Sequence, residues 1–352
     1  MSKKTTIHWC DGTVNPVMGC AGCELWTPTR KTCYAGILHG RRKTSKGFSP
    51  DFNCPKLFPG RMATAARWSD LTGTDRLDKP WLNGLPRLTF VSDMGDALSE
   101  KNTICPGNSP VHGGAVPFEY LRQEIIDAAT SEAGSRHRWL WLTKRPKRMV
   151  QFNQWLRKNF LTDIPRNVWA GTSVTKNTNL KRVDELLGVG DEKTVRFLSL
   201  EPLWEEVSLA GKLDGIHWVI VGGESRQGSS TKEFRCEWAR RLRDECAEAH
   251  VPFFLKQLGA NASASKRGIE VDMQNVAESR SLGMYATVVA GICRLDENGY
   301  TRLSISKNRT GTRPPSSVVC VNGSANNIEL NGELEYDNCT GLYITPGESM
   351  MV

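Results

Sequence analysis

Residues 20–34, CAGCELWTPTRKTCY, are the stretch around which the rest of the chain is interpreted. Three cysteines fall within this stretch, and a fourth, Cys10, lies ten residues before it. The basic N-terminus, MSKKTT, is not followed by an apolar run, so we expect no export signal. Closely spaced thiols in such a chain indicate soft-metal chemistry more than disulfides. Arg30 and Lys31 precede the last cysteine, and their positive charge favours the thiolate form that binds metals.

The number of cysteine ligands decides which chemistry this stretch predicts. Cys20, Cys23 and Cys33 alone would hold an iron–sulfur cluster and leave one position open for S-adenosylmethionine. If Cys10 also ligates, the site is closed, and a zinc site or a structural cluster becomes the better interpretation. The remaining alternative is that these are free thiols, buried as small apolar side chains.

Composition and charge indicate an ordinary globular protein. The 352 residues are 39% hydrophobic and 24% charged, and the net charge of +8 permits a polyanionic partner without requiring one. No run of about eighteen apolar residues occurs, so we expect no membrane span. Eleven irregularly spaced cysteines favour a reducing cytoplasm.

A repeating pattern predicts an α/β fold. The first expected strand is 5–10, and six later apolar runs each end in a polar or glycine-containing signature, at 88–91, 138–142, 167–170, 195–198, 216–221 and 251–255. Helical stretches are expected at 34–42, 61–69, 118–131, 147–159, 178–188 and 235–248. Alternating strands and helices predict a parallel sheet, either a partial or full βα barrel or an open doubly wound sheet. The predicted domains are 1–260, the barrel, and 261–352, a β-rich or partly disordered appendage.

Polar signatures at the carboxyl ends of the strands supply the candidate site, because ligands bind there in either architecture. Asp93 and Asp96 could bind a cation or ribose hydroxyls, or simply cap a turn. The candidate catalytic residues are Lys144, Arg145, Glu201, Glu224 and Lys256. Each alone also fits a solvated turn, but six signatures on one predicted face argue for a site.

Together with the cysteine stretch, the signatures resemble a family of bacteriophage and prophage proteins known as gene products thirty-seven and sixty-eight. The resemblance covers about residues 5–260 and rests on NPVMGC (15–20), CYA (33–35), LTKRP (142–146), SLEPL (199–203), VGGES (221–225) and FLKQ (254–257). That family resembles divergent radical S-adenosylmethionine enzymes. The resemblance implies a partial βα barrel, a [4Fe–4S] cluster on three cysteines and S-adenosylmethionine as cofactor.

This chain departs from the usual cysteine spacing of those enzymes, C-x3-C-x2-C, because its own spacing is C-x2-C-x9-C. Cys10 is a second departure, at a position where the family resemblance leads us to expect a threonine. The glycine–glycine–glutamate signature at 222–224 comes late in the chain, so its cofactor role is not transferred. The expected cofactor-binding residues are Tyr34, Ser92, Asp93, Thr172 and Ser173.

Two functions from different classes follow. The first is a cytoplasmic radical enzyme that modifies or repairs a substrate, with a nucleic acid or nucleotide favoured, and that needs a reductant protein for its cluster. The second is a non-enzymatic module in which the four cysteines hold zinc and order a nucleic-acid-binding surface. That surface would contain Arg41, Arg42, Lys43, Lys144, Arg145 and Lys147.

Overall fold

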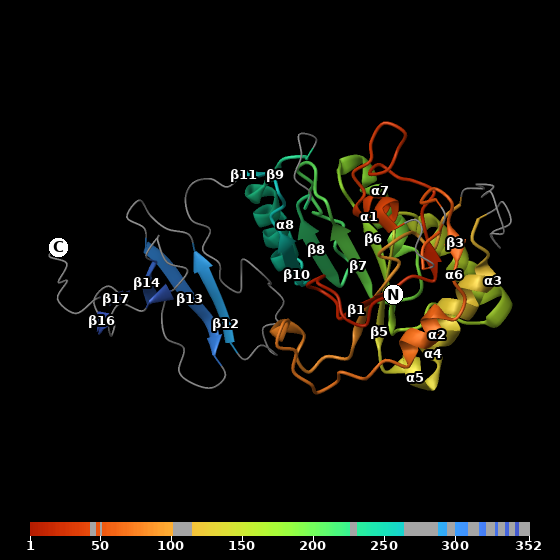
Figure 1. Ribbon diagram of the computed structural model, residues 1–352, viewed down its shortest axis with the longest axis horizontal. Helices are drawn as coiled ribbons and strands as arrows, with labels where there is room; N and C mark the ends of the chain where they lie inside the picture. The colour runs from red at the N-terminus through yellow and green to blue at the C-terminus, as the bar shows by residue number, and fades with distance from the viewer. Residues whose placement is uncertain are drawn as a thin grey trace.

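The computed structural model describes residues 1–42, 47–49, 51–100, 115–225 and 231–263, and the backbone of several strands beyond residue 287. Its centre is one parallel sheet of β1 (Gly12–Val14), β4 (Leu88–Val91), β5 (Arg138–Thr143), β6 (Val168–Ser173), β7 (Arg196–Leu200), β8 (Trp218–Gly222) and β10 (Phe253–Gln257). These seven strands lie in chain order, without the reversal that defines a doubly wound sheet. The sheet curls, and β1 and β10 remain its two edges within the described residues, so the fold is an open half-barrel (Figure 1).

Helices cover the convex face of this sheet (Figure 1). They are α2 (Arg61–Ala66), α3 (Phe118–Leu121), the π-helical turn η2 (Arg122–Ile126), α4 (Asp127–Thr130), α5 (Glu132–Ser135), α6 (Pro146–Phe160), α7 (Lys181–Leu187) and α8 (Cys236–Glu248). In α6, Pro146 occupies the first turn, where its missing N–H costs nothing, and Met149, Phe152 and Leu156 point to the sheet. The helices predicted at 118–131, 147–159, 178–188 and 235–248 are confirmed within a few residues.

Both faces of the sheet are apolar, which is why the strands read as nearly continuous hydrophobic runs. On the convex side, Val91, Trp141 and Val219 pack against the helices in the larger core. On the concave side, Phe90 and Phe197 belong to a second core that fills the half-barrel. Side chains alternate between these faces along each strand, so a polar residue two positions after a concave apolar residue lies on the concave side, at the mouth.

The first strand was predicted at the wrong place. Strand β1 begins at Gly12, and residues 5–10 form no strand. The carbonyls of this segment are paired with a side chain instead of a neighbouring strand. The Nζ of Lys79 donates hydrogen bonds to the carbonyls of Thr5, Ile7 and Cys10, at 2.7, 2.8 and 2.5 Å. The apolar run before β1 therefore supplies side chains to the concave core, and its carbonyls are satisfied by a lysine.

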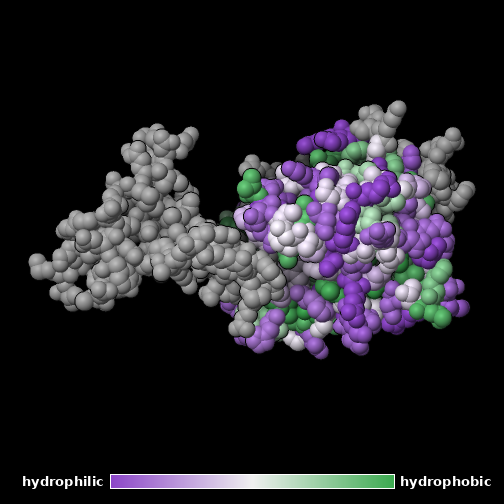
Figure 2. All heavy atoms as spheres, turned by 90° about the horizontal axis from the view of Figure 1, so that it is seen from below, coloured by the Kyte–Doolittle hydropathy of each residue, from purple (hydrophilic) through white to green (hydrophobic). Residues whose placement is uncertain are grey.

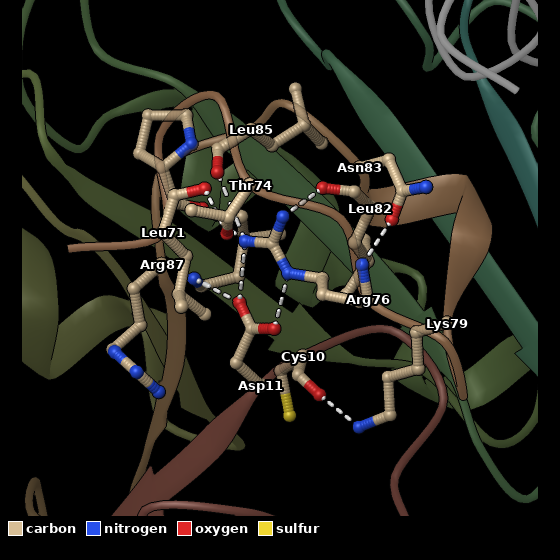
Figure 3. A network of polar contacts seen from close by, with 12 residues as sticks. Cys10, Asp11, Leu71, Thr74, Arg76, Lys79, Leu82, Asn83, Leu85 and Arg87 are labelled. Atoms are coloured by element: carbon tan, nitrogen blue, oxygen red, sulfur yellow. Dashed lines mark hydrogen bonds and ion pairs between the residues drawn. The ribbon is translucent and has the colours of Figure 1, made fainter. Parts of the chain in front are cut away.

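A buried ion pair holds the segment between α2 and β4 against Asp11, the residue that precedes β1 (Figure 3). The guanidinium of Arg76 lies 2.7 Å from the carboxylate of Asp11, and each side chain is only 6% exposed. Arg76 also donates to the carbonyls of Leu85 and Pro86. This segment contains the short 3-10 helix η1 (Pro80–Leu82), whose Trp81 packs near Phe254.

The face seen from below is mostly hydrophilic, with hydrophobic side chains in small separate groups (Figure 2).

Shorter elements complete the structure. They are β2 (Val17–Met18), β3 (Lys56–Leu57), α1 (Tyr34–Arg42), η3 (Asn177–Asn179), β9 (Phe234–Arg235) and β11 (Ala262–Ser263), followed by β12 (Val288–Cys293), β13 (Tyr300–Asn308), β14 (Ser317–Val321), β15 (Ile328–Glu329), β16 (Glu335–Asp337) and β17 (Leu342–Ile344). The helix predicted at 34–42 is confirmed as α1, and the one predicted at 61–69 begins correctly but ends at Ala66. Strands β12 to β15 pair antiparallel, as do β16 and β17. Within the described residues, no helix is long and apolar enough to cross a membrane. A domain boundary at residue 260 remains a prediction.

Candidate functional site at the carboxyl ends of the strands

The cysteine stretch forms a loop between β2 and α1. Two glycines turn its backbone, since Gly19 and Gly22 have φ of +92° and +93°. A side chain at Gly19 would also place its Cβ 2.8 Å from the carbonyl of Phe52, so both the turn and the close approach require glycine. The Cys20 N–H donates to that carbonyl at 2.7 Å. At the other end of the loop, the Cys33 carbonyl accepts the Ile37 N–H at 3.0 Å and begins α1.

Cys23 lies near enough to Cys20 and to Cys33 to affect the pKa of each. Burial raises the pKa of Cys20 to about 11, with Asp96 and Cys23 adding to the rise. Burial also raises the pKa of Cys33, and repulsion from Cys23 again contributes. Burial raises the pKa of Cys23 as well. The free thiols are therefore protonated at neutral pH, and binding a metal here would release protons.

Each thiol faces backbone N–H groups that favour its thiolate form. The donors are Gly22 for Cys20, Leu25 for Cys23, and both Ala35 and Gly36 for Cys33. The last two belong to the first turn of α1, where unpaired N–H groups and the helix dipole favour negative charge. The backbone of the loop and of α1 therefore already places N–H donors at each sulfur, which would stabilise negative charge there.

Two cations from the end of β5 are aimed at the same thiols. The Nη1 of Arg145 lies 3.9 Å from the Cys20 sulfur and 2.7 Å from a carboxylate oxygen of Asp96. The charge of Lys144 opposes the burial that raises the pKa of Cys23 and of Cys33. Its Nζ is buried and makes no hydrogen bond within the described part of the chain.

Glu24 ties the cysteine loop to the sheet and to α7. Its carboxylate accepts two hydrogen bonds from Arg182, at 2.9 and 2.8 Å, and lies 3.6 Å from the Lys144 ammonium. Burial would raise the pKa of Glu24, but Arg182 and Lys144 outweigh it and hold the pKa at about 2. Sequence reasoning missed Glu24, Arg182 and the anchoring role of Asp96, because their partners are distant in the chain.

Asp96 is a structural acceptor in this arrangement. Besides the pair with Arg145, its carboxylate accepts from the Thr143 hydroxyl at 2.9 and 3.0 Å and from the Lys144 N–H at 3.1 Å. Three donors from one strand end therefore fix a single carboxylate. The sequence interpretation had left Asp96 open between a cation ligand, a ribose ligand and a turn cap, and its contacts here are those of an anchor.

The predicted cofactor-binding residues gather beside the loop. The Tyr34 hydroxyl donates to the carbonyl of Asp93, and the residue as a whole is 47% exposed. The Asp93 carboxylate accepts from the Asn15 amide at 2.5 Å, and burial raises its pKa. Ser92 has a left-handed φ of +77°, and its buried hydroxyl makes no hydrogen bond to the described residues. Such a strained residue with a spare hydroxyl fits a ligand contact.

Thr172 and Ser173 lie at the end of β6 and are both buried. The Thr172 hydroxyl donates to the Thr143 carbonyl at 2.9 Å, which locks the ends of β5 and β6 together. The Ser173 carbonyl accepts from Arg182 at 2.9 Å. Their backbone positions belong to the site, although the Thr172 side chain is already committed to a structural bond.

The predicted catalytic residues form two pairs, and the fifth residue, Glu224, lies outside both. Glu201, at the end of β7, forms an ion pair of 2.8 Å with Lys256 of β10, and the Ser199 hydroxyl donates to it at 3.1 Å. This pair joins the carboxyl ends of β7 and β10. Lys144 and Arg145 instead face the thiols. Glu224 is held by the Lys232 N–H at 3.2 Å and by the Ala260 N–H on its own carbonyl at 2.7 Å.

Cys10 lies apart from the other three cysteines. It is fully buried in the concave core with Trp9 and Phe90, whereas Cys20 and Cys33 belong to a separate cluster with Phe52. Burial raises the pKa of the Cys10 thiol far above its ordinary value. Among the described residues, no three His, Cys, Asp or Glu side chains meet closely enough to hold one metal ion.

The proposed nucleic-acid surface of the zinc hypothesis is only partly in view. Arg41 and Arg42 end α1 and are exposed, and Lys147 is exposed near the start of α6. Lys43 lies outside the described residues. Lys144 and Arg145 are directed to the cysteine loop and to Glu24 and Asp96, so they are not part of an outer basic surface.

Fold and site together define an α/β half-barrel protein with a three-cysteine loop over the carboxyl ends of its parallel strands. The chain belongs to the family described as Protein of unknown function (DUF5131), whose model matches residues 4–334. The match spans the predicted barrel and most of the region after it. No curated protein shows significant similarity to the chain.

Proposed function

We propose that this chain is an enzyme that holds a [4Fe–4S] cluster on Cys20, Cys23 and Cys33 and uses S-adenosylmethionine as its cofactor. One observation carries the proposal: three thiols with backbone N–H donors face two cations, and the Lys144 ammonium is buried without a hydrogen-bond partner in the described structure. The Glu24 carboxylate, 3.6 Å away, balances the charge of Lys144 but accepts no hydrogen bond from it, and a buried donor without an acceptor costs about 1–3 kcal/mol. A cluster on three thiolates carries negative charge and would give the Lys144 ammonium an acceptor.

The donor set fits a cluster better than a single ion. One zinc ion needs its ligands to converge on a point, and no such convergence exists among the described side chains. A cluster distributes its cysteine ligands over several irons, so neighbouring thiols that do not converge can all bind. The position of Cys10 in a separate core also favours the three-cysteine assignment over the four-cysteine zinc site.

When bound, the cluster would supply an electron for cleavage of S-adenosylmethionine to a 5′-deoxyadenosyl radical that abstracts hydrogen from a substrate. Around it, Lys144 and Arg145 balance the charge of the thiolates. Ser92, Asp93 and Tyr34 offer a hydroxyl, a carboxylate and an exposed ring to the methionine part of the cofactor. Thr172 and Ser173 contribute the backbone of the neighbouring strand end.

The substrate would lie over the mouth between these residues and the Glu201–Lys256 pair. A carboxylate and an ammonium side by side offer both an acceptor and a donor for orienting polar substrate groups. Glu224 is farther along the same rim and would act mainly by shaping it. A reductant protein would deliver the electron, and a reducing cytoplasm suits both the cluster and the cysteine content. The resemblance to phage proteins and to radical S-adenosylmethionine enzymes supports this assignment.

Anaerobic reconstitution with iron and sulfide tests the proposal. We expect a brown protein that forms 5′-deoxyadenosine when S-adenosylmethionine and dithionite are added. Cys33→Ala should lose iron and activity. Cys10→Ser should retain both, and Cys246→Ser, in the core under α8, is a matched control for losing a buried thiol. A colourless protein with one tightly held zinc that Cys10→Ser releases would overturn the proposal in favour of the zinc module.

A further inference from the structure

The tip of the cysteine loop places two consecutive cations on two tryptophans. The Arg30 guanidinium lies 4.6 Å from the ring centre of Trp204, and the Lys31 ammonium lies 4.4 Å from that of Trp26. A tight turn fixes this tip, because Thr27 and Arg30 exchange hydrogen bonds of 2.8 and 2.9 Å. The two cations are therefore held in place and do not need to be ordered when a ligand binds.

Arg30 and Trp204 both carry a donor without an acceptor. The Nη1 of Arg30 and the Nε1 of Trp204 are buried atoms that make no hydrogen bond to the described residues. No carboxylate in the described part of the chain forms an ion pair with Arg30. Leaving such a donor unpaired costs about 1–3 kcal/mol. Two donors and a positive charge, with no acceptor of their own, point to an anionic ligand rich in acceptors.

Position distinguishes Trp204 from the other tryptophans with unpaired indole N–H groups. Those of Trp9, Trp141 and Trp218 lie in the sealed cores of the half-barrel. Trp204 is only half-buried, so a ligand can approach it. An unpaired donor at such a place fits a binding role better than a packing fault.

The Arg30–Trp204 pair also lies at the rim of the candidate site. Trp204 comes three residues after Glu201, and its backbone N–H donates to the Thr175 carbonyl beyond β6 at 2.9 Å. The Thr175 hydroxyl lies 3.3 Å from the Glu24 carboxylate in the cysteine loop. A group bound by Arg30 and Trp204 is thus next to the mouth and not on a remote surface.

We propose that Arg30 and Trp204 bind a phosphate of the substrate, and that this phosphate belongs to a single nucleic-acid strand. This inference rests on the proposed function, because it names the substrate class of that site. A guanidinium and an indole N–H match the oxygens of a phosphodiester, and the neighbouring Lys31–Trp26 pair offers a second cation and ring along the strand. An unpaired base could then enter the mouth, which a base stacked inside a duplex cannot do.

Fluorescence anisotropy with a labelled single-stranded DNA of about twelve nucleotides, roughly the span of one nucleic-acid-binding module, tests the inference on the full chain. Arg30→Gln and Trp204→Phe each remove a donor, and the second keeps an aromatic ring. The matched control is Arg235→Gln, because Arg235 lies 5.8 Å over Trp238 but is paired with Glu233. Circular dichroism confirms that each variant is folded. The readout needs neither iron nor S-adenosylmethionine, so this inference and the proposed function can fail separately.

We expect Arg30→Gln to weaken binding about tenfold and to reduce the salt dependence by about one phosphate contact. Trp204→Phe should weaken binding less, and Arg235→Gln should leave it unchanged. A nucleoside monophosphate is then added as a competitor. If it competes as well as the strand does at equal phosphate concentration, and only when Arg30 is present, the phosphate site is supported and its source is a nucleotide. No binding, or equal losses in Arg30→Gln and Arg235→Gln, would overturn the inference.

Discussion

Replacing Glu24 by glutamine removes the charge that joins the cysteine loop to the sheet. Glu24 is 12% exposed in its side chain, and it contacts Arg182 and Lys144, whose side chains are 13% and 16% exposed. Glutamine preserves the shape but cannot balance these two cations. The variant should therefore lose stability and loosen the loop that carries Cys20, Cys23 and Cys33.

The pKa of Glu24 sets the size of this effect. A carboxyl whose pKa falls from 4.5 to about 2 on folding contributes on the order of 3 kcal/mol at neutral pH. A lowered pKa means that the contribution is complete above pH 4.5 and is lost as the pH falls from 4.5 towards 2. We therefore expect Glu24→Gln to destabilise the protein by about 3 kcal/mol at pH 7 and by much less near pH 2.

Urea unfolding followed by tryptophan fluorescence measures this difference at pH 7 and pH 3. Asp184→Asn is the control. The Asp184–Lys212 pair, at 2.7 Å, is about as short as the Glu24–Arg182 pair, at 2.8 Å, but the Asp184 side chain is 57% exposed. An exposed pair contributes at most about 1 kcal/mol. A Glu24→Gln protein as stable as Asp184→Asn at pH 7, or one whose deficit grows as the pH falls, would refute the reasoning.

Three further outcomes are expected. Arg76→Met should cost about 3–5 kcal/mol in urea unfolding, since it leaves the buried Asp11 carboxylate unpaired, and an unchanged midpoint would contradict this. Gly171→Ala should cost about 1–3 kcal/mol, because its Cβ would lie 2.3 Å from the Phe197 ring, whereas Gly40→Ala, with no atom within 4 Å, should be neutral or stabilising. Iron uptake during reconstitution should increase from pH 7 to pH 9 and release protons, because the Cys20 pKa is raised to about 11; uptake that ignores pH would argue against thiol ligands.

The sequence predicts the sheet better than it predicts the site. Strands β4, β5, β6, β7, β8 and β10 fall where apolar runs end in polar signatures, because a strand buried on both faces must be apolar along its length. The first strand was misplaced, since the apolar run at 5–10 fills the concave core instead of joining the sheet. Apolarity indicates burial, and burial alone does not say whether a segment pairs with a neighbour.

The candidate residues of the site were identified by their positions directly after strands. The residues with which they pair were not identified. Sequence could not show that Lys144 and Arg145 turn towards the thiols, because Glu24 and Asp96 attract them from other segments. Neither could it show that Cys10 occupies a separate core, since ten residues of spacing from Cys20 suggest proximity in a loop. Long-range ion pairs, such as the one that joins positions 24 and 182, leave no local pattern.

The order of the strands has a consequence for synthesis on the ribosome. Each strand of the seven-stranded sheet pairs with the strand of that sheet made just before it, so the sheet can grow at one edge as the chain emerges. The cysteine loop differs from the sheet, because the partner of Glu24, Arg182, is made 158 residues later. The cysteine loop is therefore made early but is joined to α7 only after Arg182 has been made. Until then, the Glu24 carboxylate lacks the two hydrogen bonds that it accepts from Arg182 in the folded chain.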